Sequence, residues 1–153
     1  MSDNHAHHDE TFKVCVIKSD LREAELPKQA ILADAKRFQF SESATFAIKL
    51  ALEEALVNAV KHGNCCDLSK RVVVLYNVNE DMLEVIIRDE GAGFEPERVP
   101  DCTAPERLPL PNGRGIMLLR AYMDKVEYRN QGREVYLMKR RVPGADEGES
   151  SVS

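Results

Sequence analysis

Glu54 and Asn58 are polar residues in a largely apolar stretch, and their spacing places them on one side of a helix. Residues 51–64 read ALEEALVNAVKHGN, the composition of a strong helix until Gly63 stops it. At about 100° per residue, Asn58 falls about 40° from Glu54, and Lys61 falls about 20° to the other side. A carboxylate and a carboxamide in an apolar surface are costly unless something satisfies them. They either have protein partners or line a polar pocket.

The helix that carries these side chains is predicted to begin after Ser41, a good N-cap residue, and to end near His62. The other residues on the face of Glu54 are Phe46, Ala47, Leu50, Ala51 and Val57. The predicted solvent-exposed stripe consists of Glu42, Lys49, Glu53 and Val60. The helix is therefore apolar almost all round, and we expect it to be buried.

A second acidic side chain is predicted to point inward at the end of a strand. Residues 71–78 and 82–89 read as two strands of an antiparallel hairpin. The inner face of the second strand consists of Leu83, Val85 and Ile87. Alternation adds Asp89 to that face. Gly91 and Gly93 follow it in a D-x-G-x-G pattern, which indicates that the backbone approaches something closely.

A phosphate site is predicted at the start of the next helix. Gly113, Arg114 and Gly115 precede an apolar-periodic segment that begins at Ile116. Glycines at a helix start expose backbone N–H groups and the positive end of the helix dipole, and Arg114 adds a cation. The proline-rich loop at 95–112 cannot form a long helix or a central strand. A long irregular loop of this kind is usually functional or mobile.

The remaining elements complete the fold prediction. We expect an edge strand at residues 11–18, a helix beginning near Leu26 and Pro27, and a final hairpin of residues 126–128 and 134–139. The element order is β-α-α-β-β-loop-α-β-β. This order predicts an α+β fold of two layers, with helices on one face of an antiparallel or mixed sheet.

The composition of the chain limits the classes of function. Its 153 residues, 43% hydrophobic and 31% charged, suit one domain at residues 11–141 with disordered tails at 1–10 and 142–153. The net charge of −5 argues against nonspecific nucleic-acid binding. No apolar run has the length of a membrane span and no signal peptide opens the chain, so we expect a cytoplasmic protein.

The cysteines and histidines outside these motifs are interpreted as ordinary residues. The four cysteines form no C-x-x-C pair. Cys65 and Cys66 are taken as ordinary thiols of a reduced protein, with a redox or metal pair as the alternative. His5, His7 and His8 are taken as part of a flexible tail rather than a metal site, because nothing nearby would preorganise one.

The three motifs, in this order, resemble the ATP-binding domain shared by histidine kinases, gyrase and MutL, known as the Bergerat or GHKL fold. The segment from Glu54 to Ala59 resembles the N box of that family. The two glycine boxes are matched by Asp89-x-Gly91-x-Gly93-Phe94 and by Gly113-Arg114-Gly115-Ile116. The loop at 95–112 corresponds to the ATP lid. The resemblance covers about residues 11 to 141.

Within that family, the chain resembles the anti-sigma-factor serine kinases of the RsbW and SpoIIAB type. The features that carry this resemblance are the small domain, the E-A-x-x-N-A motif and residues 123–126 after the last helix. Such proteins phosphorylate a serine of a small anti-anti-sigma (STAS) partner, bind and inhibit a sigma factor in the other state, and are typically homodimers. The resemblance therefore implies an ATP- and Mg²⁺-dependent protein serine kinase with those partners.

Two other functions are compatible with the same motifs. The first is an ATP-binding regulator that sequesters a partner protein but transfers phosphate poorly or never. The second is the ATPase part of a two-part histidine kinase, whose helical domain with the phospho-accepting histidine matches no part of this sequence.

The resemblance also implies a role for each motif residue. Asn58 would hold the Mg²⁺ that bridges the phosphates, and Glu54 would accept the proton of the partner's serine. Asp89 would accept a hydrogen bond from the adenine amino group, while Lys61 could reach a phosphate or extend outward. The other residues expected to meet the nucleotide are Gly91, Gly93, Phe94, Gly113, Arg114, Gly115 and Ile116.

Overall fold

The chain folds into a five-stranded sheet with its helices on one face, as the computed structural model shows for residues 12–91 and 119–142. The elements are β1 (Lys13–Lys18), α2 (Glu25–Arg37), α3 (Glu42–Val57), the π-helical turn η1 (Asn58–Gly63), β2 (Arg71–Val78), β3 (Met82–Arg88), β4 (Lys125–Arg129), the short turn η4 (Asn130–Gly132) and β5 (Glu134–Arg140). Residues 119–122 are also helical. The predicted tails and the predicted lid at 95–112 lie outside the described residues.

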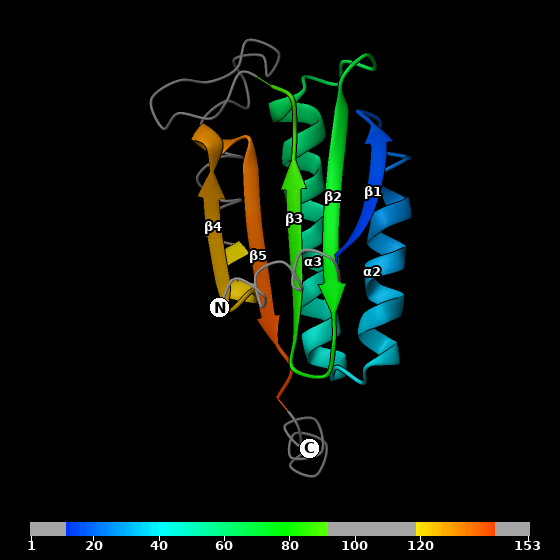
Figure 1. The fold of residues 1–153 in the computed structure, drawn as a ribbon, viewed down its shortest axis with the longest axis vertical. Helices are drawn as coiled ribbons and strands as arrows, with labels where there is room; N and C mark the ends of the chain where they lie inside the picture. Colours follow the sequence, from blue (N-terminus) through cyan, green and yellow to red (C-terminus); the bar gives the residue numbers. More distant parts are fainter. Residues whose placement is uncertain (1–11, 92–118, 143–153) are drawn as a thin grey trace.

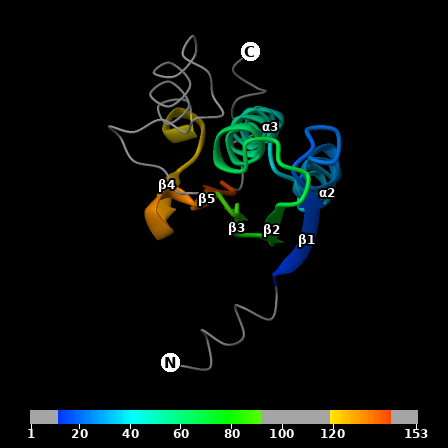
Figure 2. The same ribbon diagram turned by 90° about the horizontal axis from the view of Figure 1, so that it is seen from above.

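The strands follow the order β1-β2-β3-β5-β4, and each neighbouring pair is antiparallel. Figure 1 shows β1 at one edge and β4 at the other, and Figure 2 shows α2 and α3 on the same side of the sheet. The predicted α+β class, the two layers and the edge position of β1 are therefore confirmed. None of the helices in the described residues is long and apolar enough to cross a membrane.

The core lies between α2, α3 and the sheet, and strand alternation builds it. Val72 and Val74 of β2 are fully buried, as are Leu83 and Val85 of β3. Burial of a branched aliphatic side chain contributes about 1.5–3 kcal/mol. From α3 the core receives Ala47, Ile48, Ala51, Leu52, Ala55 and Leu56. The predicted inner face of the hairpin is thus confirmed.

Helix α3 begins where its capping residue predicts. The Ser41 hydroxyl oxygen accepts a hydrogen bond from the Ala44 amide at 3.0 Å, which satisfies one of the free N–H groups of the first turn. Helix α2 likewise begins close to its predicted start, with Pro27 in its first turn, where the missing N–H costs little.

The end of α3 departs from the predicted geometry. From Asn58 the helix widens into η1, in which the Asn64 amide donates to the carbonyl of Ala59 at 2.9 Å. The prediction that Val60 faces solvent is wrong, because it is completely buried. A wider turn ends the 100° stepping on which that prediction relied.

The apolar face of α3 is also narrower than predicted. The helical period predicts Phe46 on the same face as Glu54, but Phe46 is 59% exposed. The buried side of the helix is centred on Ile48, Leu52 and Ala55, and Phe46 lies beyond Glu54 from that centre. The stripe that carries Glu54 is therefore a flank of α3 and not its sheet-facing side.

The interpretation of both neighbouring cysteines as ordinary thiols is wrong for one of them. Cys65 is disulfide-bonded, whereas Cys15 and Cys66 are free. Sequence spacing could not show this, because a disulfide requires the two Cα atoms to come within about 7 Å in the folded chain.

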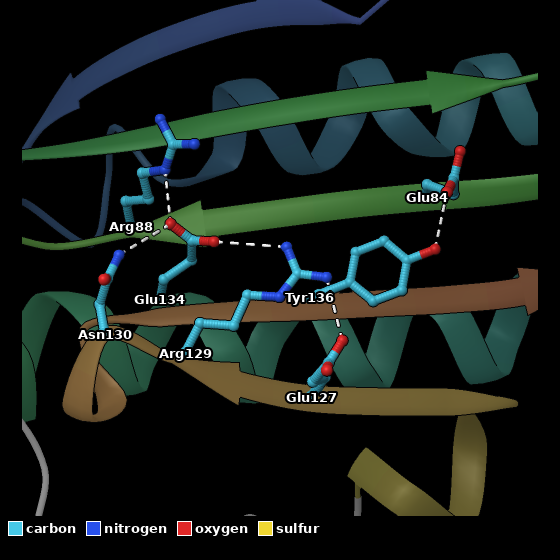
Figure 3. Close-up of polar contacts among 7 residues, drawn as sticks. All are labelled: Glu84, Arg88, Glu127, Arg129, Asn130, Glu134 and Tyr136. Carbon is cyan, nitrogen blue, oxygen red and sulfur yellow. Dashed lines mark hydrogen bonds and ion pairs between the residues drawn. The ribbon is translucent and has the colours of Figure 1, made fainter. Parts of the chain in front are cut away.

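The sheet face that no described helix covers carries an ion-pair network around Glu134 (Figure 3). One carboxylate oxygen of Glu134 accepts from Arg88 Nε at 2.7 Å and from Asn130 Nδ2 at 3.3 Å, and the other accepts from Arg129 Nη1 at 3.5 Å. The Glu134 side chain is only 7% exposed, whereas the two arginines are 49% and 41% exposed. This carboxylate therefore connects β3, β4 and β5.

We expect Glu134→Gln to lower the free energy of unfolding by about 1–2 kcal/mol, because a buried carboxylate that serves three donors becomes a neutral amide. Urea unfolding at pH 7 measures the change. The matched control is Glu127→Gln, since Glu127 is exposed and contacts only Arg129 within this network, at 3.0 Å. That control should change stability little, and equal losses in the two variants would contradict the assignment.

Candidate functional site

The candidate site lies where the end of β3 meets the end of α3 (Figure 1). Asp89 follows β3 directly, and one of its carboxylate oxygens accepts a hydrogen bond from the Gly91 amide at 2.8 Å. A methyl group added to Gly63 would overlap the Asp89 carboxyl group, and one added to Gly91 would overlap the Gly63 carbonyl. The absence of side chains at both glycines therefore allows this close approach.

Burial changes the acid–base behaviour of Asp89. Loss of hydration raises the pKa of its carboxyl from 3.8 to about 6. The hydrogen bond from Gly91 and the charges of Arg133 and Lys70 lower the pKa, but their combined effect is smaller than that of burial. The site thus holds a carboxylate whose ionised form would gain from a hydrogen-bond donor.

Two further segments hold the turn after β3. The Asp89 amide donates to the carbonyl of Arg133 at 2.8 Å, and Arg133 Nε donates back to the carbonyl of Gly91 at 2.9 Å. From the end of η1, the side chain of Asn64 accepts a hydrogen bond from the Glu90 amide at 2.7 Å. The turn that carries Asp89 is therefore tied to the end of η1 and to the residue before β5.

Asn58 presents a buried oxygen to the candidate site. Its Oδ1 atom is buried and, within the described residues, has no hydrogen-bond partner. Buried polar atoms are nearly always paired, so such an atom indicates a ligand or another function. Carboxamide oxygen is a suitable ligand for Mg²⁺. Among the described residues, no group of three or more histidine, cysteine or acidic side chains could hold a metal ion. The Asn58 oxygen could therefore hold Mg²⁺ together with oxygen ligands from outside the protein.

Glu54 lies one helical turn before Asn58, on the flank of α3 that faces β4. The pKa of the Tyr128 hydroxyl in β4 rises to about 12, mainly through burial and then through the negative charge of Glu54, while Arg120 opposes the shift. Glu53 points elsewhere, because its carboxylate pairs with Lys28 Nζ of α2 at 3.0 Å. The two adjacent acids thus have different surroundings, and Glu54 is the one near β4.

The other predicted site residues divide into two groups. Gly91 lies against Gly63 in the site, and Lys61 is exposed in η1. The remaining residues, outside the described part of the chain, are Gly93, Phe94, Gly113, Arg114, Gly115 and Ile116.

Sequence reasoning missed three residues of this site, namely Gly63, Asn64 and Arg133. Gly63 was interpreted only as a helix stop, and its second effect depends on Asp89, a residue of another element. Asn64 carried only a weak signal, since asparagine is, after glycine, a residue found just beyond helix ends. Nothing in the sequence near Arg133 indicated contact with the turn.

Residues 17–139 match the family described as the histidine kinase-like ATPase domain. The chain belongs to this family, as its motifs predicted. Among named relatives, the serine-protein kinase RsbW of Oceanobacillus iheyensis is 30% identical over 114 residues, which cover 71% of this chain and 72% of the relative. The anti-sigma F factor of Clostridium perfringens is 32% identical over 99 residues, 61% and 70% of the two chains. The RsbW protein of Bacillus subtilis is 29% identical over 117 residues, 72% of each.

We expect Asp89→Asn to stabilise the nucleotide-free protein at neutral pH. Because the folded-state pKa of about 6 exceeds the ordinary 3.8, the folded protein binds this proton more tightly than the unfolded chain. The stability contributed by the protonated carboxyl is therefore present at pH 4 and is lost as the pH rises through about 6. The ionised group should cost on the order of 2–3 kcal/mol at pH 8. Asparagine avoids this cost and can still accept from Gly91.

Urea unfolding at pH 4 and pH 8 measures this effect, with a clear gain expected only at pH 8. The control is Asp67→Asn, because hydrogen bonds from Ser69 lower the pKa of the Asp67 carboxyl and its ionised form is favoured. That variant should not gain stability at pH 8. A loss of stability for Asp89→Asn at pH 8 would mean that the charge of Asp89 supports the fold.

Proposed function

We propose that this chain is an ATP- and Mg²⁺-dependent protein serine kinase of the anti-sigma type, which phosphorylates a STAS-type anti-anti-sigma protein. The observation that carries the proposal is the buried Oδ1 atom of Asn58, one helical turn from Glu54, which has no hydrogen-bond partner in the part of the chain that the structure describes. A structural amide would be expected to have a partner. The names of the relatives, serine-protein kinase and anti-sigma F factor, support the same activity.

Glu54 is the proposed general base. In the transfer step, the serine hydroxyl oxygen of the partner forms a bond to the γ-phosphorus of ATP, and the bond from that phosphorus to the bridging oxygen of ADP breaks. The serine proton goes to the Glu54 carboxylate, and ADP leaves. Such a reaction depends on positioning and charge stabilisation more than on covalent chemistry by the protein. Mg²⁺, when bound, supplies neutralisation of the phosphate charges, and Asn58 would hold it.

Asp89 is the proposed adenine acceptor. Its carboxylate sits in a polar turn fixed by Arg133 and Asn64, and the adenine amino group can donate to it. The donor would favour the ionised carboxylate, so nucleotide binding would offset part of the desolvation that raises the pKa of Asp89 in the free protein.

The proposed partners follow from the same activity. A STAS protein would supply the serine, and a sigma factor would be bound and inhibited in the alternative state, with the kinase acting as a homodimer. We place the protein in the cytoplasm because such partners act there, although structural disulfides such as that of Cys65 are uncommon in that compartment.

Incubation of the protein with a STAS domain and γ-labelled ATP tests this function. Label on a serine of the STAS domain is the expected result. If the domain stays unlabelled while ATP binds tightly, the protein is an ATP-binding regulator and the kinase proposal is wrong. Label on a histidine would instead indicate part of a histidine kinase.

We expect Glu54→Gln to keep nucleotide affinity but to slow phosphoryl transfer by about 100-fold or more, the usual contribution of a general base. Quenched-flow measurement of labelled STAS product gives the rate. Glu53→Gln is the matched control, since Glu53 is the adjacent acid and pairs with Lys28. Normal transfer by Glu54→Gln, or equal slowing by the control, would remove Glu54 as the base.

We expect Asn58→Ala to weaken ATP binding about tenfold or more when Mg²⁺ is present and to have little effect when it is absent. Isothermal titration with and without Mg²⁺ measures both values. Asn77→Ala is the control, because Asn77 lies on β2, on the sheet face away from the helices. Unchanged Mg²⁺-dependent affinity, together with a large loss of stability, would make Asn58 a structural residue.

A further inference from the structure

Asn64 is a completely buried polar residue directly after the helix that carries Glu54 and Asn58. Its backbone amide donates to the carbonyl of Ala59 at 2.9 Å, so the end of η1 fixes its position. A fully buried carboxamide requires partners for its donors and its acceptor. The hydrogen bonds of the Asn64 side chain therefore show which segments of the chain it connects.

Three hydrogen bonds use the Asn64 side chain. Oδ1 accepts from the Glu90 amide at 2.7 Å, while Nδ2 donates to the Arg71 carbonyl and to the Ser19 hydroxyl oxygen, both at 2.8 Å. The orientation of the amide is unambiguous, because a backbone N–H can only donate and a carbonyl can only accept. One side chain thus connects the end of η1 to the start of β2 and to the turn after β3.

One of these contacts reaches the middle residue of the turn that carries Asp89, namely Glu90. Glu90 lies between Asp89 and Gly91, and its carboxylate accepts a hydrogen bond from the Arg71 amide at 3.0 Å. The backbone of Arg71 is therefore hydrogen-bonded through its amide to Glu90 and through its carbonyl to Asn64. Gly63, the neighbour of Asn64, offers the backbone surface against which the Asp89 carboxyl group lies. The amide of Asn64 therefore sets how closely the turn approaches η1.

We infer that Asn64 is the positioning residue for the Asp89 carboxyl group, and that it thereby determines the preference of this site for adenine over guanine. The inference rests on the function proposed above, in which Asp89 accepts the adenine amino group. A guanine base presents a carbonyl oxygen at the corresponding position and would be repelled by a fixed carboxylate. A carboxylate that could move would discriminate less, because water could then mediate the contact.

Substitutions of Asn64 and of its partner Ser19 remove different hydrogen bonds, so we expect them to affect the turn differently. Asn64→Ala leaves the Glu90 amide without an acceptor and releases the turn from η1. Asn64→Asp keeps an acceptor for Glu90 but places a carboxylate oxygen against the Arg71 carbonyl, which repels it. Ser19→Ala is the matched control, because it removes one Asn64 partner and leaves the bonds to Glu90 and Arg71 intact.

The first measurement is the ratio of dissociation constants for GTP and ATP in the full chain. We expect Asn64→Ala to lower this ratio about tenfold and Asn64→Asp to lower it less, while Ser19→Ala changes it by less than about twofold. Melting temperatures confirm that the variants are folded, and Asn64→Asp serves if Asn64→Ala is not. A folded Asn64 variant with the wild-type ratio would overturn the inference.

The second measurement needs no nucleotide and therefore separates this inference from the proposed function. Carboxyl-carbon NMR follows the titration of Asp89, whose charged neighbours are Arg133 and Lys70. In the wild type, the pKa of the Asp89 carboxyl is raised from 3.8 to about 6. In Asn64→Ala, which adds no charge near Asp89, a loosened turn admits water, so the pKa of Asp89 should fall toward the ordinary value. If wild-type protein binds ATP and GTP equally, the role proposed for Asp89 fails. An unchanged pKa of Asp89 in folded Asn64→Ala would overturn the positioning role whichever nucleotide binds.

Discussion

The approach of the Asp89 carboxyl group to the backbone of Gly63 is the constraint on which the rest of the site depends. It requires a residue without a side chain at the end of the long helix, because any Cβ there would overlap the carboxyl group. The same approach removes water from the carboxylate and raises its pKa. Asn64 and Arg133 then hold the turn from two sides by hydrogen bonds, next to the helix end.

The candidate site contains two buried polar groups, in Asn58 and Asp89, whose surroundings do not stabilise them fully. The Asn58 oxygen is buried without a partner among the described residues, and Asp89 is a carboxylate in a poorly hydrated position. We expect each arrangement to lower stability, a cost that the buried core around α3 offsets. A nucleotide with its metal ion would supply a cation to one group and a donor to the other. Under the proposed function, the groups that destabilise the free protein would thus be the ones that the ligand stabilises.

Much of this protein could be predicted from the order of its residues. Alternation in β2 and β3 predicted the hairpin and its inner face, and the Ser41 cap predicted the start of α3. These predictions succeeded because they depend on contacts between residues near one another in sequence. The 3.6-residue period likewise separated Glu54 from Glu53. The motifs placed the chain in the histidine kinase-like ATPase family, which the match over residues 17–139 confirms.

Tertiary structure alone decided the features that depend on distant segments or on irregular backbone. The π-helical turn at Asn58 buried Val60, because a widened turn breaks the regular period. The sheet order places β5 beside β3 and so brings Arg133 to the turn of Asp89. Asn64 became a central residue only when the ends of three segments met around it. One hydrogen bond of the Asn64 side chain joins it to Ser19, 45 positions away, and no local pattern encodes such a contact.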